Sequence, residues 1–211
     1  MKDIQDVLVL GPHTDDGEFG CGGTIARFVE EGKNVYYATF SCAEESVPEG
    51  FPKNILETEV KKASKVLGIE RDRLLIYRYP VRKFDHYRQD ILEDLVQLNR
   101  DIKPDLVLMP SNYDLHQDHY VVSMEGLRAF KFTSILAYEM PWNNITFETR
   151  SFVYLKERHV DKKLESVKCY RSQTGRNYAN AEFIRGLAKS RGVQAGVEYA
   201  ETFDVKRWII K

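Results

Sequence analysis

The sequence predicts an α/β fold: a Rossmann-like, doubly wound and mainly parallel sheet with strand order of about 3-2-1-4-5 and a C-terminal α/β elaboration. The first observation is a set of short, continuous apolar runs that end at glycine or proline, typical of strands buried on both faces. The second is that segments with apolar residues at helical spacing separate these runs. Such alternation implies right-handed crossovers and a parallel sheet.

The first part of the chain supplies two strands and two helices. Residues 7–11 form an apolar run that stops at a Gly-Pro pair, and residues 35–40 form a second run rich in aromatic and β-branched side chains. Between them, a helix over 24–31 follows a glycine-rich stretch and ends at a glycine. A polar loop then leads to a helix over 55–67, which aligns Val60, Ala63 and Leu67.

The same alternation continues through the middle of the chain. Strands are predicted over 74–77, 106–109 and 135–140, and the last two stop at prolines. Helices are predicted over 87–102 and 119–130, the first of them because it aligns Ile91, Leu95 and Leu98.

The periodicity weakens after residue 147. We expect a strand over 152–155, helices over 160–170 and 181–189, and a closing strand over 198–210. Because no repeat, low-complexity tract or linker interrupts the chain, residues 1–211 are expected to form a single domain.

Composition excludes several classes of protein. The 31 Lys and Arg residues balance 32 Asp and Glu residues, which argues against an electrostatic nucleic-acid partner. No apolar run approaches the roughly 18 residues of a membrane span, and three widely spaced cysteines do not suggest a disulfide framework. We therefore expect a cytoplasmic protein with a small-molecule substrate and no membrane partner. An aromatic content of 12% leaves a homo-oligomer as an open alternative.

Two polar segments follow predicted strands that should be neighbours. The first contains His13, Asp15 and Asp16, and the second contains His116, Asp118 and His119. In a doubly wound sheet, ligands bind beyond the carboxyl ends of the strands where the winding reverses. With strands one and four adjacent, the two segments should face each other across one crevice.

These side chains predict a catalytic metal site. Two imidazoles and one carboxylate are a common ligand set for catalytic Zn²⁺, and His13, Asp16 and His119 would supply it. Asp15 would then be free to act as general base on a zinc-bound water. His116 would stabilise an oxyanion or donate a proton, oriented by Asp118 through its other ring nitrogen. Fe²⁺ also suits such a ligand set.

The glycine-rich stretch allows a different interpretation. Residues 20–23 read Gly-Cys-Gly-Gly after the first strand, and Glu44 and Glu45 lie where a ribose-binding acid belongs in a dinucleotide site. However, the G-x-G-x-x-G spacing is absent, and the three carboxylates in the turn would repel a pyrophosphate. We therefore predict that these glycines allow close backbone packing where a helix starts.

The two motifs resemble those of one known family. The sequence HTDDGEFGCGGT at residues 13–24 resembles the HPDDE and G-x-G-G-T signature of the LmbE-like, or PIG-L, deacetylases, and HQDH at 116–119 resembles their HxDH motif. GVEYAETF at 196–203 resembles their C-terminal G-x-x-Y-A-E-x-F segment. The resemblance implies a zinc-dependent N-deacetylase acting on N-acetylglucosamine-type sugars, with the ligands and catalytic residues named above.

The chain departs from the family pattern in places, and one of these departures, the missing arginine, bears on the substrate. Thr14 replaces the usual proline, and the helix after the Glu44 loop opens without the substrate-contacting arginine expected there. Glu44, Arg82 and Arg88 are therefore our candidates for substrate binding, and the alternative for the two arginines is that they are solvated surface charges. The tail of the chain carries four further arginines, Arg171, Arg176, Arg185 and Arg191. They allow two interpretations: a rim for a sugar phosphate or nucleotide, or a salt-bridged surface or subunit contact.

The sequence as a whole predicts a metal-dependent hydrolase that removes an N-acetyl or short N-acyl group from a glucosamine-type sugar, glycoconjugate or sugar nucleotide. The alternative is a non-catalytic sugar- or nucleotide-binding protein that retains the fold.

Overall fold

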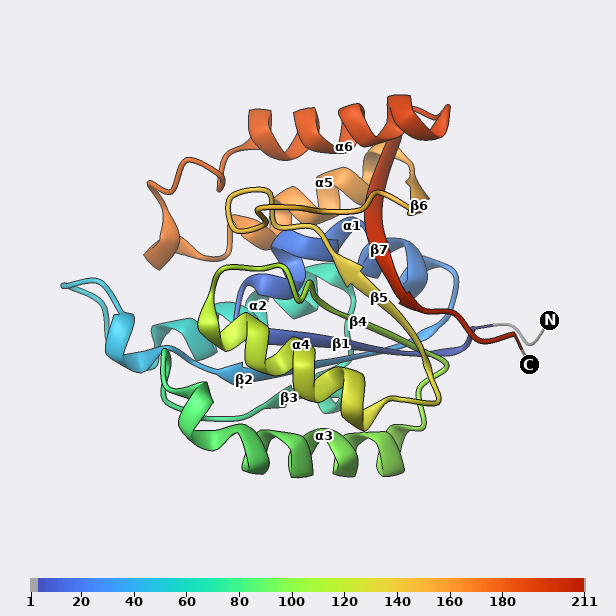
Figure 1. The fold of residues 1–211 in the computed structure, drawn as a ribbon. Helices are drawn as coiled ribbons and strands as arrows, with labels where there is room; N and C mark the ends of the chain where they lie inside the picture. The colour runs from blue at the N-terminus through green and yellow to red at the C-terminus, as the bar shows by residue number, and fades with distance from the viewer. Residues whose placement is uncertain (1–3, 211) are drawn as a thin grey trace.

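A computed structural model describes residues 4–210. Its centre is a seven-stranded sheet in the order β3-β2-β1-β4-β5-β7-β6 (Figure 1). The strands are β1 Asp6–His13, β2 Asn34–Ser41, β3 Leu74–Ile76, β4 Leu106–Pro110, β5 Ser134–Tyr138, β6 Ser151–Leu155 and β7 Tyr199–Arg207. The helices are α1 Asp16–Glu30, α2 Ile55–Leu67, α3 Arg88–Ile102, α4 Gln117–Ala129, α5 Glu157–Val167 and α6 Ala181–Ala195.

The strand order confirms the predicted doubly wound arrangement. The first five strands are parallel neighbours in the order 3-2-1-4-5. The C-terminal elaboration adds β7 antiparallel to β5, and β6 antiparallel to β7. The sheet is therefore mainly parallel with an antiparallel edge.

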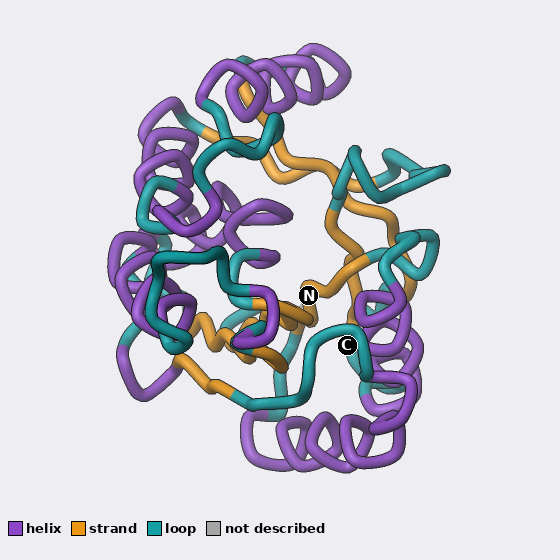
Figure 2. The backbone as a smooth tube through the Cα atoms, turned by 90° about the vertical axis from the view of Figure 1, so that its left-hand side faces the viewer, coloured by secondary structure: helices purple, strands orange, loops and turns teal. Residues whose placement is uncertain are grey.

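Helices cover both faces of the sheet, as Figure 2 shows. Successive side chains of a strand point to opposite faces. Accordingly, Val7 and Val9 of β1 pack in one apolar core with α1, α2, α5 and α6. Leu8 and Leu10 pack in the other core with α3 and α4. These two buried faces explain why β1 reads as a continuous apolar run.

Helix α1 differs most from its prediction. It begins at Asp16 rather than at residue 24, so the glycine-rich stretch is itself helical, with a kink at Cys21. A Cβ atom on Gly17 would lie 2.8 Å from the Tyr37 ring, and one on Gly20 would lie 2.3 Å from the Tyr138 ring. The predicted close packing is thus present, but inside the helix.

Other helices and strands differ from their predicted boundaries by a few residues. Helix α5 begins at Glu157 and ends at Val167, earlier than the predicted 160–170. Helix α4 begins two residues early, because His116 caps its N-terminus. Strand β7 ends at Arg207. Within residues 4–210, no helix combines the length and apolar character that crossing a bilayer requires.

Candidate metal centre and pocket

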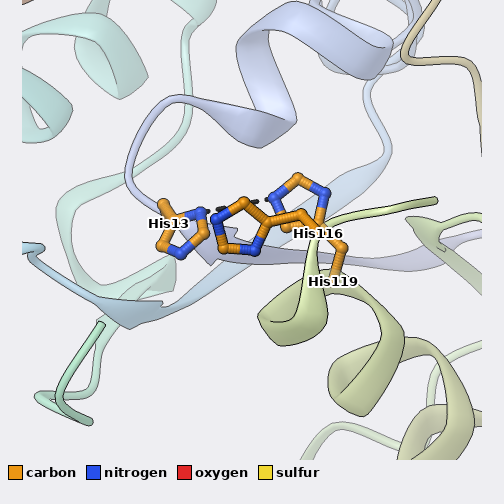
Figure 3. A group of neighbouring side chains, drawn as sticks. All are labelled: His13, His116 and His119. Atoms are coloured by element: carbon orange, nitrogen blue, oxygen red, sulfur yellow. Dashed lines mark hydrogen bonds between the residues drawn. The ribbon is translucent and has the colours of Figure 1, made fainter. Parts of the chain in front are cut away.

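The pairing of β1 with β4 brings the two polar segments together. The register aligns Val7 with Leu106 and Val9 with Leu108, so both strands deliver their loops to the same edge. His13 ends β1, and His116 and His119 lie at the start of α4. Figure 3 shows the three imidazoles as close neighbours that come from these elements.

Three donor atoms form a nearly equilateral triangle. Asp16 Oδ2 lies 3.2 Å from His13 Nδ1 and 3.2 Å from His119 Nε2, and the two nitrogens are 3.3 Å apart. Zn–N and Zn–O bonds of about 2.0–2.1 Å in a tetrahedron place ligand atoms about 3.3 Å from one another. The three atoms thus have the spacing of three ligands of one tetrahedral ion.

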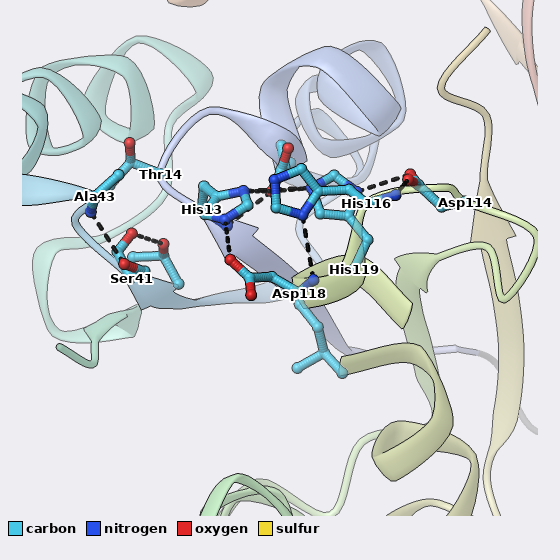
Figure 4. Close-up of polar contacts among 12 residues, drawn as sticks. His13, Thr14, Ser41, Ala43, Asp114, His116, Asp118 and His119 are labelled. Atoms are coloured by element: carbon cyan, nitrogen blue, oxygen red, sulfur yellow. Dashed lines mark hydrogen bonds and ion pairs between the residues drawn. The ribbon is translucent and has the colours of Figure 1, made fainter. Parts of the chain in front are cut away.

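A carboxylate holds the far nitrogen of each of these imidazoles. His13 Nε2 lies 2.9 Å from Asp118 Oδ2, and His119 Nδ1 lies 2.7 Å from Asp114 Oδ2 (Figure 4). Because an ionised carboxylate only accepts hydrogen bonds, each of these nitrogens carries the proton. The lone pairs of His13 Nδ1 and His119 Nε2 therefore point into the triangle when the rings are neutral, as metal ligation requires.

His116 has a different arrangement. Its Nδ1 accepts a hydrogen bond of 3.2 Å from the backbone N–H of Asp118, so its Nε2 carries the proton in the neutral ring. The predicted orientation of His116 by the Asp118 carboxylate is wrong, because that carboxylate faces His13. His116, with His13 and His119, also belongs to a group whose possible ligand atoms lie within 4.8 Å of one another.

The charges of the cluster are strongly coupled. Burial lowers the pKa of His13, but the charge of Asp16 and the hydrogen bonds that the ring donates to Asp118 and Asp16 raise it to about 9. Burial also lowers the pKa of His119, but Asp16 and Asp114 outweigh it and raise that pKa to about 10. Burial works against ionised Asp16, yet His119 and His13 hold its pKa well below the ordinary value. Without a cation, the cluster therefore binds protons where a metal would bind.

Asp15 lies beside the triangle without belonging to it. Although it precedes α1, its side chain makes no capping hydrogen bond. Burial, and then the charge of Asp16, raise the pKa of Asp15 to about 6, and His13 and Arg176 act in the opposite direction. A carboxylate with a pKa near neutrality is suited to accept and return a proton.

The cluster forms one wall of a pocket of about 310 Å³. Trp142 and Tyr178, whose rings stack at 4.0 Å, line the same pocket, and Phe19 meets both edge to face. Arg176 also lines the pocket and donates hydrogen bonds to Gln173 and Tyr178. The lining of the pocket thus combines the histidine and carboxylate cluster with a group of aromatic rings and an arginine.

Of the three substrate-binding candidates, the structure places Arg82 at the pocket but not Glu44 or Arg88. Arg82 lines the pocket in a left-handed backbone conformation, with φ of 65°, and its N–H donates to Asp118 at 2.6 Å. Glu44 does not line the pocket, because its carboxylate pairs with Arg78. Arg88 does not line it either, because its guanidinium pairs with buried Glu125.

No sequence pattern marks Asp114 or Trp142 as a residue of the site. Asp114 lies in the segment between β4 and α4 with no spacing signature to mark it. Trp142 lies in the loop after β5, four residues beyond Tyr138, so the rule that ligands bind at the carboxyl edge of the sheet could have found it. Of the tail arginines, Arg176 reaches the pocket, whereas Arg185 and Arg191 pair with Asp161 and Glu139.

Fold and site together define a class: doubly wound α/β proteins with a histidine and carboxylate cluster at the carboxyl edge of the sheet. The profile of one family, PIG-L, described as GlcNAc-PI de-N-acetylase, matches residues 8–130. This chain therefore belongs to the PIG-L family.

The relatives of this chain include deacetylases. The chain is 25% identical to the diacetylchitobiose deacetylase of Thermococcus kodakarensis over 226 residues, covering 95% of this chain and 83% of that protein. The crystal structure of the conserved protein TT1542 from Thermus thermophilus is 27% identical, with a TM-score of 0.81 over 99% of this chain and 97% of that one.

The fold is not confined to deacetylases. GalB, the 4-carboxy-2-hydroxymuconate hydratase of Pseudomonas putida KT2440, has a TM-score of 0.78 at 20% identity, covering 99% of this chain and 98% of its own. At that identity, the likeness shows a shared fold alone. The reaction must therefore be argued from the site.

Proposed function

We propose that this protein is a metal-dependent N-deacetylase that hydrolyses the acetamide of an N-acetylated amino sugar to acetate and the free amine. The proposal is supported chiefly by the triangle of His13 Nδ1, Asp16 Oδ2 and His119 Nε2, with sides of 3.2–3.3 Å, in the pocket that also holds Asp15. Family membership and a named deacetylase relative point the same way.

His13, Asp16 and His119 would hold the ion, with Asp118 and Asp114 fixing the two imidazoles from behind. A divalent ion supplies Lewis acidity, which polarises an amide carbonyl and makes water a better nucleophile near neutral pH. We propose Zn²⁺ because the donor spacing fits its tetrahedral geometry, and Fe²⁺ is the alternative for the same ligands.

Asp15 is the proposed general base. It lines the pocket beside Asp16 but makes no capping bond, so its carboxylate is free to accept a proton from the attacking water. The water oxygen forms the new bond to the acetamide carbon, and the C–N bond then breaks. Asp15 returns the proton to the departing nitrogen, so water, acetate and amine balance.

His116 is the proposed stabiliser of the developing oxyanion. Its Nδ1 is occupied by the backbone N–H of Asp118, so the neutral ring offers Nε2–H as a donor, and its side chain lines the pocket. A fixed donor of this kind stabilises charge that appears only in the transition state.

The pocket favours a small sugar substrate. Its volume of about 310 Å³ is at the lower end of the range for ligand pockets, which suits a sugar ring with its acetamide better than a large glycoconjugate. Trp142 and Tyr178 offer an apolar surface for a sugar ring, and Arg82 and Arg176 offer donors for its hydroxyls or for an anionic substituent.

The test is release of free amine from a panel of N-acetylated mono- and disaccharides. The protein is assayed as purified, after dialysis against a chelator, and after addition of Zn²⁺ or Fe²⁺. We expect amine release that is lost with the chelator and restored by one of the metals. Sugar binding without amine release would instead favour the non-catalytic alternative, and activity that survives removal of all metal would overturn the proposal.

A further inference from the structure

Helix α1 consists of two sections. Its interior residue Cys21 has φ of −146° and ψ of 26°, so the turn that carries Asp16 and the longer section from Gly22 to Glu30 join at one non-helical residue. The amides of the first turn after such a break face no carbonyl in helical register, and they need another acceptor.

Glu201 of strand β7 supplies that acceptor from 177 residues away. Its Oε2 accepts from the Thr24 N–H at 2.7 Å and from Thr24 Oγ1 at 2.6 Å, and its Oε1 accepts from the Gly23 N–H at 3.1 Å. Lys163 of α5 donates to the same Oε1 at 2.7 Å. Every member of this group is buried, so the carboxylate has exchanged water for four fixed donors.

The glycines at positions 22 and 23 make this approach possible. A Cβ atom on Gly22 would lie 3.0 Å from Lys163 Cγ, across the path of the lysine stem. A Cβ atom on Gly23 would lie 2.5 Å from Leu155 Cδ1 and 3.2 Å from Glu201 Oε1. Thus the Gly-Cys-Gly-Gly run, which in a dinucleotide site would face a phosphate, lies against a carboxylate and a lysine.

The kink also determines where the front section of α1 points. On one side of Cys21, Gly20 packs against the ring of Tyr138. Further forward, Asp16 Oδ2 accepts from the backbone N–H of His13 at 2.7 Å while facing both imidazoles. Glu201 and Lys163 hold the rear section of α1. The direction of the front turn is then set by Cys21, the one non-helical residue between the two sections.

We propose that Glu201, charge-paired with Lys163, is a positioning residue: it fixes the kink of α1 and thereby holds Asp15 and Asp16 at the geometry that the metal centre needs. The inference rests on the proposed function for its catalytic consequence. The inference gives strand β7 a role in the site, although the residues that line the pocket lie between His13 and Tyr178 in the chain.

The test compares Glu201→Gln with Glu139→Gln. The control also removes a buried charge that ties the C-terminal elaboration to the sheet, but Glu139 pairs with Arg191 of α6 rather than with α1. Three quantities are measured in the full-length protein: hydrogen exchange of the amides at 16–24, affinity for Zn²⁺, and kcat and KM for amine release.

In Glu201→Gln we expect faster exchange at 16–24, Zn²⁺ affinity lower by about 10-fold or more, and a fall in kcat larger than the change in KM. Glu139→Gln should keep parental values of all three. Parental exchange and Zn²⁺ affinity in folded Glu201→Gln would overturn the proposal.

A milder variant covers the case in which Glu201→Gln does not fold. Thr24→Val removes only the hydroxyl donor and keeps the pair of Glu201 with Lys163, so smaller changes in the same direction are expected, and no change would contradict the proposal. Exchange and metal affinity need no substrate. If the parent protein released no amine, the proposed function would fail while these two measurements still decided the role of Glu201.

Discussion

The Asp118 carboxylate joins the two polar segments of the site, because its Oδ2 lies 2.9 Å from Nε2 of His13, 105 positions earlier in the chain. The same oxygen accepts from the Arg82 N–H at 2.6 Å, and Oδ1 accepts from the Phe84 N–H at 3.3 Å. Asp118 thus fixes the ring of His13 from α4 and is itself held by the loop after β3. His13 is therefore oriented by residues from two other parts of the sheet edge.

We expect Asp118→Asn to weaken metal binding by about 10–100-fold, the usual cost of removing a carboxylate behind a ligating histidine. The asparagine keeps the size of the side chain but loses the charge that favours the required tautomer of His13. The measurement is a competition titration with a chromophoric chelator. Asp101→Asn, on the exposed side of α3, is the control and should bind metal like the parent. Parental affinity in Asp118→Asn would contradict the assignment.

Asp114→Asn should have a comparable effect through the other imidazole. Asp114 Oδ2 lies 2.7 Å from His119 Nδ1, and its Oδ1 accepts from the His116 N–H at 2.8 Å. Because the Asp114 and Asp118 variants act on different ligands of one ion, the double variant should lose more affinity than either alone. If the double variant binds the metal as tightly as the weaker-binding single variant, only one of the two imidazoles is a ligand.

Asp15→Asn should keep the metal and lose turnover. We expect kcat to fall by about 10²–10⁴-fold, the usual contribution of a general base, while the metal content after dialysis stays parental. Elemental analysis and single-turnover kinetics on the same preparation separate the two effects. Loss of the metal together with activity would instead place Asp15 among the ligands.

The pH dependence of the parent enzyme should show an acidic limb that belongs to Asp15. The base must be ionised, so kcat/KM should rise with pH until Asp15 has lost its proton. Its pKa is raised to about 6, chiefly by burial, and a bound cation can only lower it, so we expect the limb no higher than about pH 6. Arg176→Gln removes a positive charge that favours ionised Asp15 and should move the limb upward. An unmoved limb would show that another group titrates.

Sequence alone could predict the sheet order and the two loops, because both follow from patterns among residues that are close together in the chain. The run 7–11 is apolar on both faces, and the polar segments come directly after strands one and four. The sequence could not predict which imidazole each of Asp114 and Asp118 contacts, since two carboxylates lie within reach of three imidazoles. Only the side-chain geometry assigns Asp118 to His13 and Asp114 to His119.

The early start of α1, at Asp16 rather than at residue 24, could not be predicted for a related reason. Glycine disfavours helices, so four glycines between residues 17 and 23 argue against one on propensity alone. Tertiary contacts override that preference, because the rings of Tyr37 and Tyr138 occupy the space where Cβ atoms would be. These contacts come from β2 and β5, which local sequence does not reveal.

Glu18 gives a prediction about stability that is separate from the chemistry. Its side chain is fully buried beside the hydroxyls of Tyr170, at 2.9 Å, and Tyr37, at 3.2 Å. Burial raises the pKa of Glu18 from 4.5 to about 8. The folded state therefore holds a proton that the unfolded chain releases above pH 4.5, so this group's contribution to stability declines as the pH rises from about 4.5 to about 8.

Glu18→Gln replaces the protonated carboxyl with a neutral group of the same shape that can both donate and accept. The variant should gain stability relative to the parent across that pH window, by about 1.36 kcal/mol for each pKa unit of difference between the folded and unfolded states. Urea denaturation of both proteins at pH 5 and pH 8.5 measures the difference, with the exposed Glu93→Gln as control. If the difference between Glu18→Gln and the parent is the same at both pH values, Glu18 is not the protonated group that its burial indicates.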